Sequence, residues 1–375
     1  MTKLVAIALE GEAFVSAVKK VWNEKKALCP IDLRLSKKMQ QEQIDLLQPD
    51  SIISFEDLEE HSWQGKQIYQ PLENDDALVI QTSGSSGEPK LVVHTHSSLL
   101  ASAKATSKAL EISAGDEWLA CLPLAHIGGL SVVTRSLIMG TKLTVLDKFE
   151  PESVMKAAEQ GATLVSLVTR TLNQIDTAAF RKILIGGGPA PERLPQNVIP
   201  TYGMTETGSG VVYGQEVLDG VELKEIYGEL FLRGPMLFRA YRSSAVIESP
   251  LVDGWFPTGD LGSVDKDGIK VFGKKSEVIR TGGEDVWPEK LEKVLLTHKN
   301  ISDVAVSSTP DDEWGNVVIV NAVKADHGQE LKLEELQELA KSVLPKWYTP
   351  KKLVIADSIP RTALGKIKRS EIVLQ

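Results

Sequence analysis

The residues with the clearest chemical potential form a glycine- and hydroxyl-rich stretch, QTSGSSGEPKLVVHTH, at positions 81–96. Glycines let backbone N–H groups approach an anion, while hydroxyls and a lysine add donors and positive charge. This predicts a phosphate cradle rather than the alternative, a solvated surface turn. It is not a Walker loop, because Leu91 rather than Ser or Thr follows the lysine. The predicted cradle residues are Thr82, Ser83, Gly84, Ser85, Ser86, Gly87 and Lys90.

Two further stretches carry groups suited to a nucleotide. In TYGMTETGSG, residues 201–210, Glu206 suits Mg²⁺, which prefers a carboxylate together with phosphate oxygens and water. Tyr202 in the same stretch is suited to stacking on a base. In GWFPTGDLG, residues 254–262, Asp260 is suited to accept both hydroxyls of a ribose. Each has a purely structural alternative when taken alone: a solvated turn, a packing tyrosine or an Asx-turn aspartate.

A fourth stretch, IPRTALGKIKR at residues 359–369, places Lys366 in a basic segment near the C-terminus. Such a segment is usually just solvated. A functional role requires the segment to fold over the phosphate loop.

The elements that must position these groups alternate along the chain. Short apolar runs of strand length include ALVIQ, KLVVHTH, EWLACLP, TKLTVLD, TLVSLV, KILIGG and NVIPTYG. Helical patterns lie between several of them, such as PESVMKAAEQ and SSLLASAKATSKALEI, the latter with Ser97 or Ser98 as its expected cap. This alternation predicts an α/β fold with mostly parallel sheets covered by helices, and ligands at the loops beyond the strand ends.

The pattern changes after about residue 210. Strand-rich segments and hairpins come first, and the last hundred residues or so mix strands with helices such as PEKLEKVLLTHK and LKLEELQELAKSVL. This mixture predicts a separate small α+β domain. The expected domains are residues 1–273 and residues 274–375.

Composition narrows the class of protein. The chain has 375 residues, 42% hydrophobic and 25% charged, which is ordinary for a globular enzyme. Its net charge of −9 argues against nonspecific nucleic-acid binding. The two cysteines, Cys29 and Cys121, are expected to be inert buried thiols. We find no signal peptide and no apolar run long enough to span a bilayer, so a cytoplasmic protein is expected.

Five motifs in register over residues 77–369 resemble the acyl-adenylate-forming superfamily of acyl-CoA synthetases, peptide-synthetase adenylation domains and luciferases. They are TSGSSGEPK, YGMTE, TGD, GKKSEVIRTGGEDVWPEKLE and PRTALGKIKR. The resemblance implies an AMP-forming acid–thiol ligase that uses ATP, Mg²⁺ and coenzyme A. A carboxylate attacks the α-phosphate of ATP to give an acyl-adenylate and pyrophosphate, and a thiol then displaces AMP. It also implies that the small C-terminal domain is a lid that rotates between the two steps.

The resemblance implies a role for each matched residue. Lys366 bridges the carboxylate and the α-phosphate, Thr205 contacts the α-phosphate, and Glu206 binds the magnesium ion. His126 is the third catalytic candidate. Besides the phosphate loop, the expected nucleotide- and coenzyme-binding residues are Gly187, Gly188, Pro189, Thr201, Tyr202, Gly203, Met204, Asp260, Lys274, Gly282 and Gly283.

Some features depart from the family pattern. Lys274 stands where the family usually has Arg, and it loses the bidentate fork of a guanidinium. Ser276 stands at the hinge position usually held by aspartate or lysine. The chain is also short at its N-terminus, which implies that a peripheral subdomain of larger relatives is reduced or missing.

A further motif resembles one branch of this family. LPLAHIGGLS, residues 122–131, resembles the corresponding motif of o-succinylbenzoate–CoA ligases of menaquinone and phylloquinone biosynthesis, which implies that His126 lies near the acyl pocket. That substrate has a second carboxylate, for which Arg170 and Gln174 are the candidate partners. The alternatives are a ligase for another aromatic or aliphatic acid, a module that loads a carrier-protein thiol, and a nucleotide-binding pseudoenzyme. A homodimer is the expected assembly.

Overall fold

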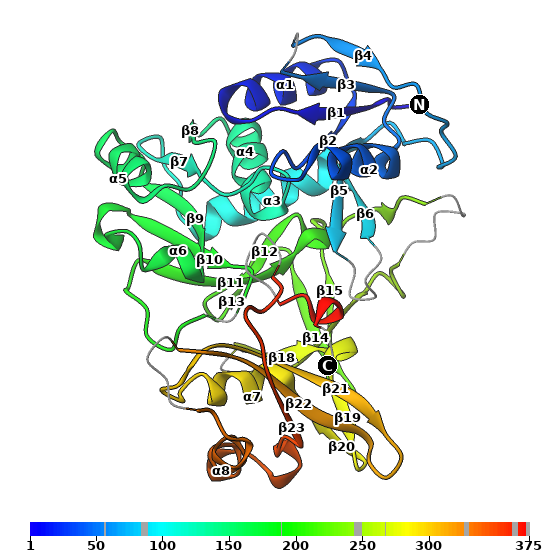
Figure 1. Cartoon of the computed structure of the whole chain (residues 1–375). Coiled ribbons are helices and arrows are strands. Elements are labelled where there is room, and N and C mark those ends of the chain that lie inside the picture. The colour runs from blue at the N-terminus through cyan, green and yellow to red at the C-terminus, as the bar shows by residue number, and fades with distance from the viewer. Residues whose placement is uncertain are drawn as a thin grey trace. The chain divides into compact units, whose positions relative to one another are not determined.

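The computed structural model describes residues 1–55, 58–83, 89–188, 190–243, 250–266, 268–325, 330–361 and 367–372 (Figure 1). The chain packs into two compact units. The first comprises the described residues of 1–223 and 231–257, and the second those of 224–230 and from 258 onward. The domain boundary at residues 273 and 274 therefore stays a prediction.

The first sheet of the first unit has seven strands in the order β16-β6-β5-β2-β1-β3-β4. Its centre is parallel, because β1 pairs in parallel with β2 and β3, and β2 pairs in parallel with β5. Both edges are antiparallel. Buried strands in the parallel centre explain the continuous apolar runs. The elements are β1 (Leu4–Ala8), α1 (Gly11–Asn23), β2 (Ala27–Pro30), α2 (Lys37–Leu47), β3 (Ser51–Ser54), β4 (Glu60–Ser62), β5 (Asp76–Ser83), β6 (Pro89–Thr95) and β16 (Ala240–Tyr241).

The second sheet has the order β13-β12-β11-β10-β9-β7-β8, parallel from β8 to β11 and antiparallel at β12 and β13. Helix α3 contacts strands of both sheets and packs against α4. The strands are β7 (Glu117–Ala120), β8 (Lys142–Val145), β9 (Leu164–Val168), β10 (Lys182–Gly186), β11 (Val198–Met204), β12 (Ser209–Tyr213) and β13 (Glu216–Val217). The helices are α3 (His96–Ala109), α4 (Ile127–Met139), α5 (Pro151–Glu159) and α6 (Thr169–Leu172).

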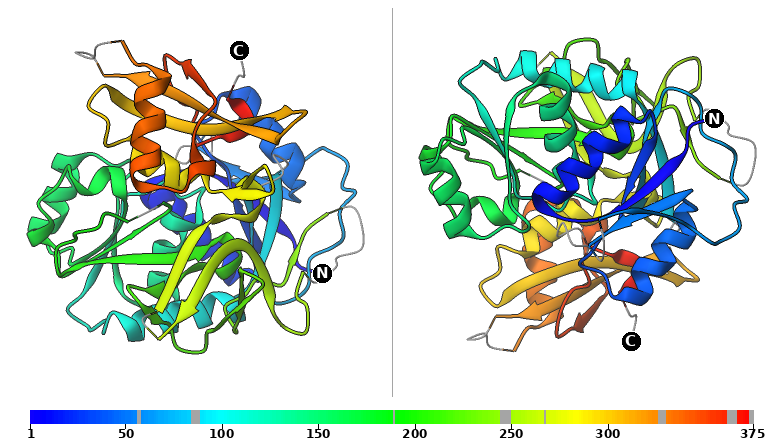
Figure 2. Two further views of the ribbon diagram at one scale, coloured as in Figure 1. Left: turned by 90° about the horizontal axis from the view of Figure 1, so that it is seen from below. Right: turned by 90° about the horizontal axis from the view of Figure 1, so that it is seen from above.

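The strands that follow also agree with the sequence pattern; β17 with β18 and β21 with β22 pair antiparallel, whereas β22 with β23 pair in parallel. One sheet has the order β14-β15-β17-β18, and a second has the order β21-β22-β23. Helix α7 packs against β21 and α8 (Figure 2, yellow to orange). The elements are β14 (Glu222–Ile226), β15 (Glu229–Arg233), β17 (Phe256–Asp265), β18 (Gly268–Lys274), β19 (Ile279–Thr281), β20 (Glu284–Val286), α7 (Pro288–Leu295), β21 (Ile301–Asp311), β22 (Gly315–Lys324), α8 (Leu333–Val343) and β23 (Lys352–Ile355).

The predicted fold class is confirmed, and one local detail is corrected. The cap of α3 is Thr95 rather than Ser97 or Ser98, because the Thr95 side chain accepts a hydrogen bond from the Ser98 backbone N–H at 3.0 Å. The Ser98 hydroxyl accepts in return from the Thr95 backbone N–H at 3.1 Å, which completes a reciprocal cap. No helix in the described part of the chain is long and apolar enough to cross a membrane.

Candidate active site

The described residues on either side of the predicted phosphate loop belong to the strands β5 and β6. The two strands pair antiparallel up to its base, with Thr82 opposite Lys90 and Ser83 opposite Pro89. Gly84, Ser85, Ser86 and Gly87 lie outside the described residues. The ammonium nitrogen of Lys90 lies 4.9 Å from the centre of the Tyr241 ring. The hairpin therefore brings together the described hydroxyl and lysine of the predicted cradle.

The motif at residues 201–210 forms the end of β11 and the turn that follows. Gly203 lies at a bulge in the pairing with β12, and a Cβ there would lie 2.3 Å from the carbonyl oxygen of Ser209. Only glycine fits this close approach. The Thr207 hydroxyl accepts a hydrogen bond from the Met204 N–H at 3.0 Å, which closes the short 3₁₀ turn Thr205–Thr207. The turn holds Thr205 and Glu206 in fixed positions beyond the strand end, where ligands of such sheets collect.

The carboxylate of Glu206 is held by one neighbouring hydroxyl. Tyr241 Oη donates a hydrogen bond to Glu206 Oε1 at 2.8 Å, and the Phe238 N–H donates to the Glu206 carbonyl oxygen, also at 2.8 Å. Burial raises the pKa of Tyr241, and the charge of Glu206 raises it further, so the phenol stays protonated. Sequence reasoning missed Tyr241, because its motif carries no chemical signature of its own.

The donor set at this turn fits magnesium. Within the described residues there is no group of three or more His, Cys, Asp or Glu side chains able to hold a metal ion. Glu206 is therefore a single carboxylate rather than part of a protein cage. Magnesium typically binds one or two carboxylates, substrate phosphates and water. A single carboxylate, Glu206, close to the β5–β6 hairpin allows this arrangement.

A buried histidine fixes the other side of the same turn. His94 is 0% exposed, and its Nε2 lies 2.7 Å from the carbonyl oxygen of Thr205, to which it donates. Its Nδ1 lies 3.1 Å from the Ser98 hydroxyl. Burial lowers the pKa of His94 to about 4, so the ring is neutral at physiological pH. Sequence reasoning assigned this residue no role.

Stability is expected to fall on acidification because His94 must stay neutral. In the unfolded chain this group binds a proton near pH 6.5, and in the folded chain only near pH 4. Its contribution is therefore complete above pH 6.5 and is lost as the pH falls from there toward 4, by about 2 kcal/mol at roughly pH 5. Urea midpoints at about pH 7.5 and about pH 5 measure the loss. His94→Gln keeps a donor without titrating, so it should flatten this dependence, and an unchanged pH dependence would contradict the assignment.

His126 is the residue that precedes the first turn of α4, and its side chain contacts an arginine. Arg34 Nη2 lies 2.7 Å from His126 Nε2, and the same guanidinium forms a two-point ion pair with Asp32 at 2.6 and 2.8 Å. His126 Nε2 also lies 3.5 Å from Asp32 Oδ2. A guanidinium only donates hydrogen bonds, so the shorter contact, with Arg34, favours the tautomer in which Nε2 accepts and Nδ1 carries the proton. His126 thus has a donor to offer, with its side chain 30% exposed.

Asp260 and Lys274 lie directly opposite each other on β17 and β18. Lys274 Nζ lies 2.7 Å from Asp260 Oδ1 and donates to the carbonyl oxygen of Thr258 at 3.3 Å. Asp260 is 6% exposed, so the lysine that replaces the usual arginine balances a nearly buried carboxylate. Both residues belong to the second unit.

Two predicted glycines form the turn of the β19–β20 hairpin. Gly282 and Gly283 have φ angles of +57° and +83°, a region that glycine adopts without strain. A Cβ on Gly282 would also lie 2.8 Å from the Trp314 ring. The hairpin turn therefore requires glycine at position 282 on two counts.

The remaining predicted residues are distributed as follows. Gly187 follows β10 with a φ of +84°, and a Cβ on its neighbour Gly186 would lie 2.8 Å from the Thr201 hydroxyl. Pro189 and Lys366 lie outside the described residues. Arg170 and Gln174 are both exposed, and the Gln174 amide donates to the Arg170 carbonyl oxygen at 3.0 Å.

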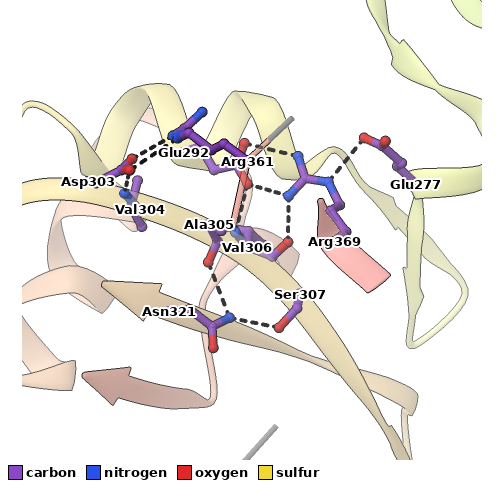
Figure 3. Close-up of polar contacts among 10 residues, drawn as sticks. All are labelled: Glu277, Glu292, Asp303, Val304, Ala305, Val306, Ser307, Asn321, Arg361 and Arg369. Atoms are coloured by element: carbon purple, nitrogen blue, oxygen red, sulfur yellow. Dashed lines mark hydrogen bonds and ion pairs between the residues drawn. The ribbon is translucent and has the colours of Figure 1, made fainter. Parts of the chain in front are cut away.

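The described residues on either side of positions 362–366 are anchored by two arginines (Figure 3). Arg361 forms an ion pair with Asp303 at 2.6 Å. Arg369 donates to both carboxylate oxygens of Glu292, at 2.5 and 3.1 Å, and to Glu277 at 3.0 Å. It also donates to the Val306 carbonyl oxygen at 2.9 Å. The described residues Arg361 and Arg369, at the two ends of positions 362–366, are therefore bound to the second unit by ion pairs.

Residues 10–226 match the family model described as AMP-binding enzyme, and residues 290–366 match the AMP-binding enzyme C-terminal domain. The chain therefore belongs to the AMP-binding enzyme family, as an AMP-forming acid–CoA ligase. Over 369 residues it is 34% identical to the 2-succinylbenzoate–CoA ligase of Enterococcus faecalis, covering 86% of this chain and 76% of that one. It is 32% identical over 351 residues to the ligase of the same name from Listeria monocytogenes, covering 85% and 74%.

Solved structures agree with this assignment. The fold is similar to that of o-succinylbenzoate CoA synthetase from Bacillus subtilis in complex with the acyl-adenylate intermediate OSB-AMP. The TM-score is 0.85 at 27% identity, covering 98% of this chain and 87% of that one. The complex of the same enzyme with ATP and magnesium ion also gives 0.85 at 27% identity, covering 98% and 89%. MatB from Rhodopseudomonas palustris, at 19% identity and a TM-score of 0.82, shows the shared fold alone.

Proposed function

We propose that this chain is an ATP-dependent o-succinylbenzoate–CoA ligase of menaquinone or phylloquinone biosynthesis. It joins one carboxylate of the acid to AMP with release of pyrophosphate, and then transfers the acyl group to CoA with release of AMP. The observation that carries adenylation is the turn after β11, where Glu206 stands as a single hydrogen-bonded carboxylate. The choice of acid is supported by relatives at 32–34% identity that bear this activity in their names.

Different residues of the chain would bind different phosphates of ATP. Thr82, Ser83 and Lys90, with the glycines between them, hold the β- and γ-phosphates. Glu206 holds the magnesium ion, which supplies positive charge that neutralises the phosphate oxygens when bound. Thr205 contacts the α-phosphate. Lys366 faces the charge that develops as the carboxylate attacks, and catalysis is mostly positioning and charge stabilisation of this kind.

The acid and the nucleoside would be held by the residues that the motifs predict. His126 donates its Nδ1–H to the reacting carboxylate, in the tautomer that Arg34 favours. Tyr202 stacks on adenine beside Gly187 and Gly188. Asp260 accepts from the ribose hydroxyls, with Lys274 as its counter-ion. The Gly282 turn serves the thiol step.

Two finer points belong to the same proposal. The second carboxylate of the acid would be bound in the segment after β9, where Gln174 and Arg170 are exposed. We also propose a cytoplasmic location. We propose a homodimeric assembly as well, and size-exclusion chromatography of the native protein tests it.

A panel of acids tests the substrate. Pyrophosphate exchange into ATP, followed by thioester formation with CoA, should occur with o-succinylbenzoate and be much weaker with benzoate or fatty acids that lack its second carboxylate. Exchange with benzoates or fatty acids but not with o-succinylbenzoate would overturn the choice of acid. Transfer to a carrier-protein thiol but not to CoA would overturn the thiol assignment.

A further inference from the structure

Tyr241 lies between two predicted site residues because of a short edge strand. Strand β16 pairs antiparallel with β6, placing Tyr241 opposite Val92, a residue of the hairpin that carries Lys90. The backbone on both sides is fixed as well. The Arg239 N–H donates to the Val93 carbonyl oxygen at 2.9 Å, and the Arg242 N–H donates to the Leu91 carbonyl oxygen at 2.8 Å. The position of the Tyr241 backbone is therefore set by the phosphate hairpin itself.

The side chain of Tyr241 contacts one negatively charged and one positively charged group. Its hydroxyl donates to Glu206 Oε1 at 2.8 Å, and its ring centre lies 4.9 Å from the ammonium of Lys90. The ring also packs against Phe238, with 4.7 Å between ring centroids, and Phe238 packs against Phe256 at 5.2 Å. The aromatic packing restricts the ring, so the hydroxyl is aimed at the carboxylate.

Tyr241 thus contacts two residues of opposite charge, Lys90 and Glu206. A lysine and a glutamate that face the same site would gain energy by pairing directly, and each would then be less available to a ligand. Within the described residues Lys90 forms no ion pair; its ammonium lies over the face of the tyrosine ring instead. Glu206 is held at one oxygen by a neutral donor, which leaves its second oxygen for another partner.

We propose that Tyr241 is a positioning residue that holds the Glu206 carboxylate for magnesium and the Lys90 ammonium for phosphate, and prevents the two from pairing. The proposal rests on the proposed role of Glu206 as the magnesium ligand. Groups that orient a metal ligand typically change metal affinity by about 10- to 100-fold when removed. The ring and the hydroxyl of Tyr241 make separable contributions, which allows a stepwise test.

The hydroxyl is tested with Tyr241→Phe, which keeps the ring. Mn²⁺ is the probe, and its binding to the protein is measured by electron paramagnetic resonance with an ATP analogue that has a methylene bridge between the α- and β-phosphates. We expect about tenfold weaker Mn²⁺ binding. The matched control is Tyr213→Phe, which removes a buried hydroxyl that lies 3.0 Å from the Thr106 hydroxyl in the same unit. Unchanged Mn²⁺ affinity in Tyr241→Phe, or an equal loss in the control, would overturn the proposal.

The ring is tested with Tyr241→Leu and the same analogue without metal. Loss of a cation–π contact should weaken nucleotide binding about threefold relative to Tyr241→Phe. Equal nucleotide affinity in the two variants would show that the ring does not position Lys90. Thermal midpoints measured alongside identify any loss that follows from a smaller folded fraction.

A double-mutant cycle tests whether Tyr241 acts through Glu206. If it does, Tyr241→Phe should cause no further loss of Mn²⁺ affinity in a Glu206→Gln background. A second loss of about tenfold in that background would overturn the proposal. These binding measurements use neither an acid nor CoA. A wild-type protein that binds Mn²⁺ and the analogue but turns over no acid would therefore reject the proposed function alone.

Discussion

Replacing Lys366 with alanine is expected to slow adenylation by about 100- to 1,000-fold while leaving thioester formation nearly intact. In the first step a carboxylate attacks the α-phosphate, and negative charge develops on oxygens that Lys366 would stabilise in the proposed function. In the second step the thiol attacks a carbonyl group, and under the proposed two-pose lid the Gly282 turn would serve this step instead. A residue that acts in only one pose of the lid should affect only one half-reaction.

Two assays separate these steps. Pyrophosphate exchange reports adenylation, and conversion of a supplied acyl-adenylate with CoA reports the thiol step. Lys368→Ala is the matched control, because Lys368 lies in the same basic segment and pairs with Glu371 at 2.7 Å on the surface. Its effect on exchange should be small. Equal loss of both half-reactions in Lys366→Ala would contradict a lid with two poses.

Replacing Arg369 with methionine is expected to destabilise the second unit by about 3–5 kcal/mol. Glu292 is 6% exposed and would lose both hydrogen bonds from Arg369, keeping only the neutral donor of the Val306 N–H at 2.7 Å (Figure 3). The pKa of Arg369 is raised: burial opposes its charge, but the hydrogen bonds and charges of Glu292 and Glu277 prevail. Because an uncompensated buried charge is costly, the loss is much larger than for a surface ion pair.

Urea unfolding of the full chain measures this loss. Arg361→Met is the matched control, because its partner Asp303 is 31% exposed, and it should cost no more than about 1 kcal/mol. A second change, Glu292→Gln in the Arg369→Met background, should recover much of the stability by removing the stranded charge. Equal losses of unfolding free energy in the two arginine variants would show that the burial of Glu292 does not determine the effect.

The sequence pattern was sufficient for the strands and helices that carry the site. Apolar runs such as TLVSLV and KILIGG could be assigned to buried parallel strands because both of their faces are covered. The motif at residues 201–210 could be placed at a strand end for the same reason. Gly203 was part of that prediction, and the structure supplies its cause, which is the 2.3 Å that a Cβ would leave to the Ser209 oxygen.

The supporting contacts could not be predicted, because each joins residues far apart in sequence. His94 bonds to Thr205 across 111 positions, and Tyr241 to Glu206 across 35. Arg369 was part of a segment that reads as a solvated basic tail, since its partner Glu292 lies 77 positions earlier. Contacts of this kind depend on tertiary packing, and the local periodicity of the sequence does not reveal them. The roles of Lys366 and of the phosphate-loop glycines still rest on the motifs that contain them.

The measurement that tests the central claim most directly is the exchange of radiolabelled pyrophosphate into ATP, with magnesium and o-succinylbenzoate present and CoA absent. Exchange requires that the acyl-adenylate form reversibly on the protein, so it isolates the first half-reaction. We predict exchange that depends on o-succinylbenzoate and is lost in Glu206→Gln. Absence of exchange with o-succinylbenzoate and with every other acid would contradict the assignment of this chain as an acid–CoA ligase.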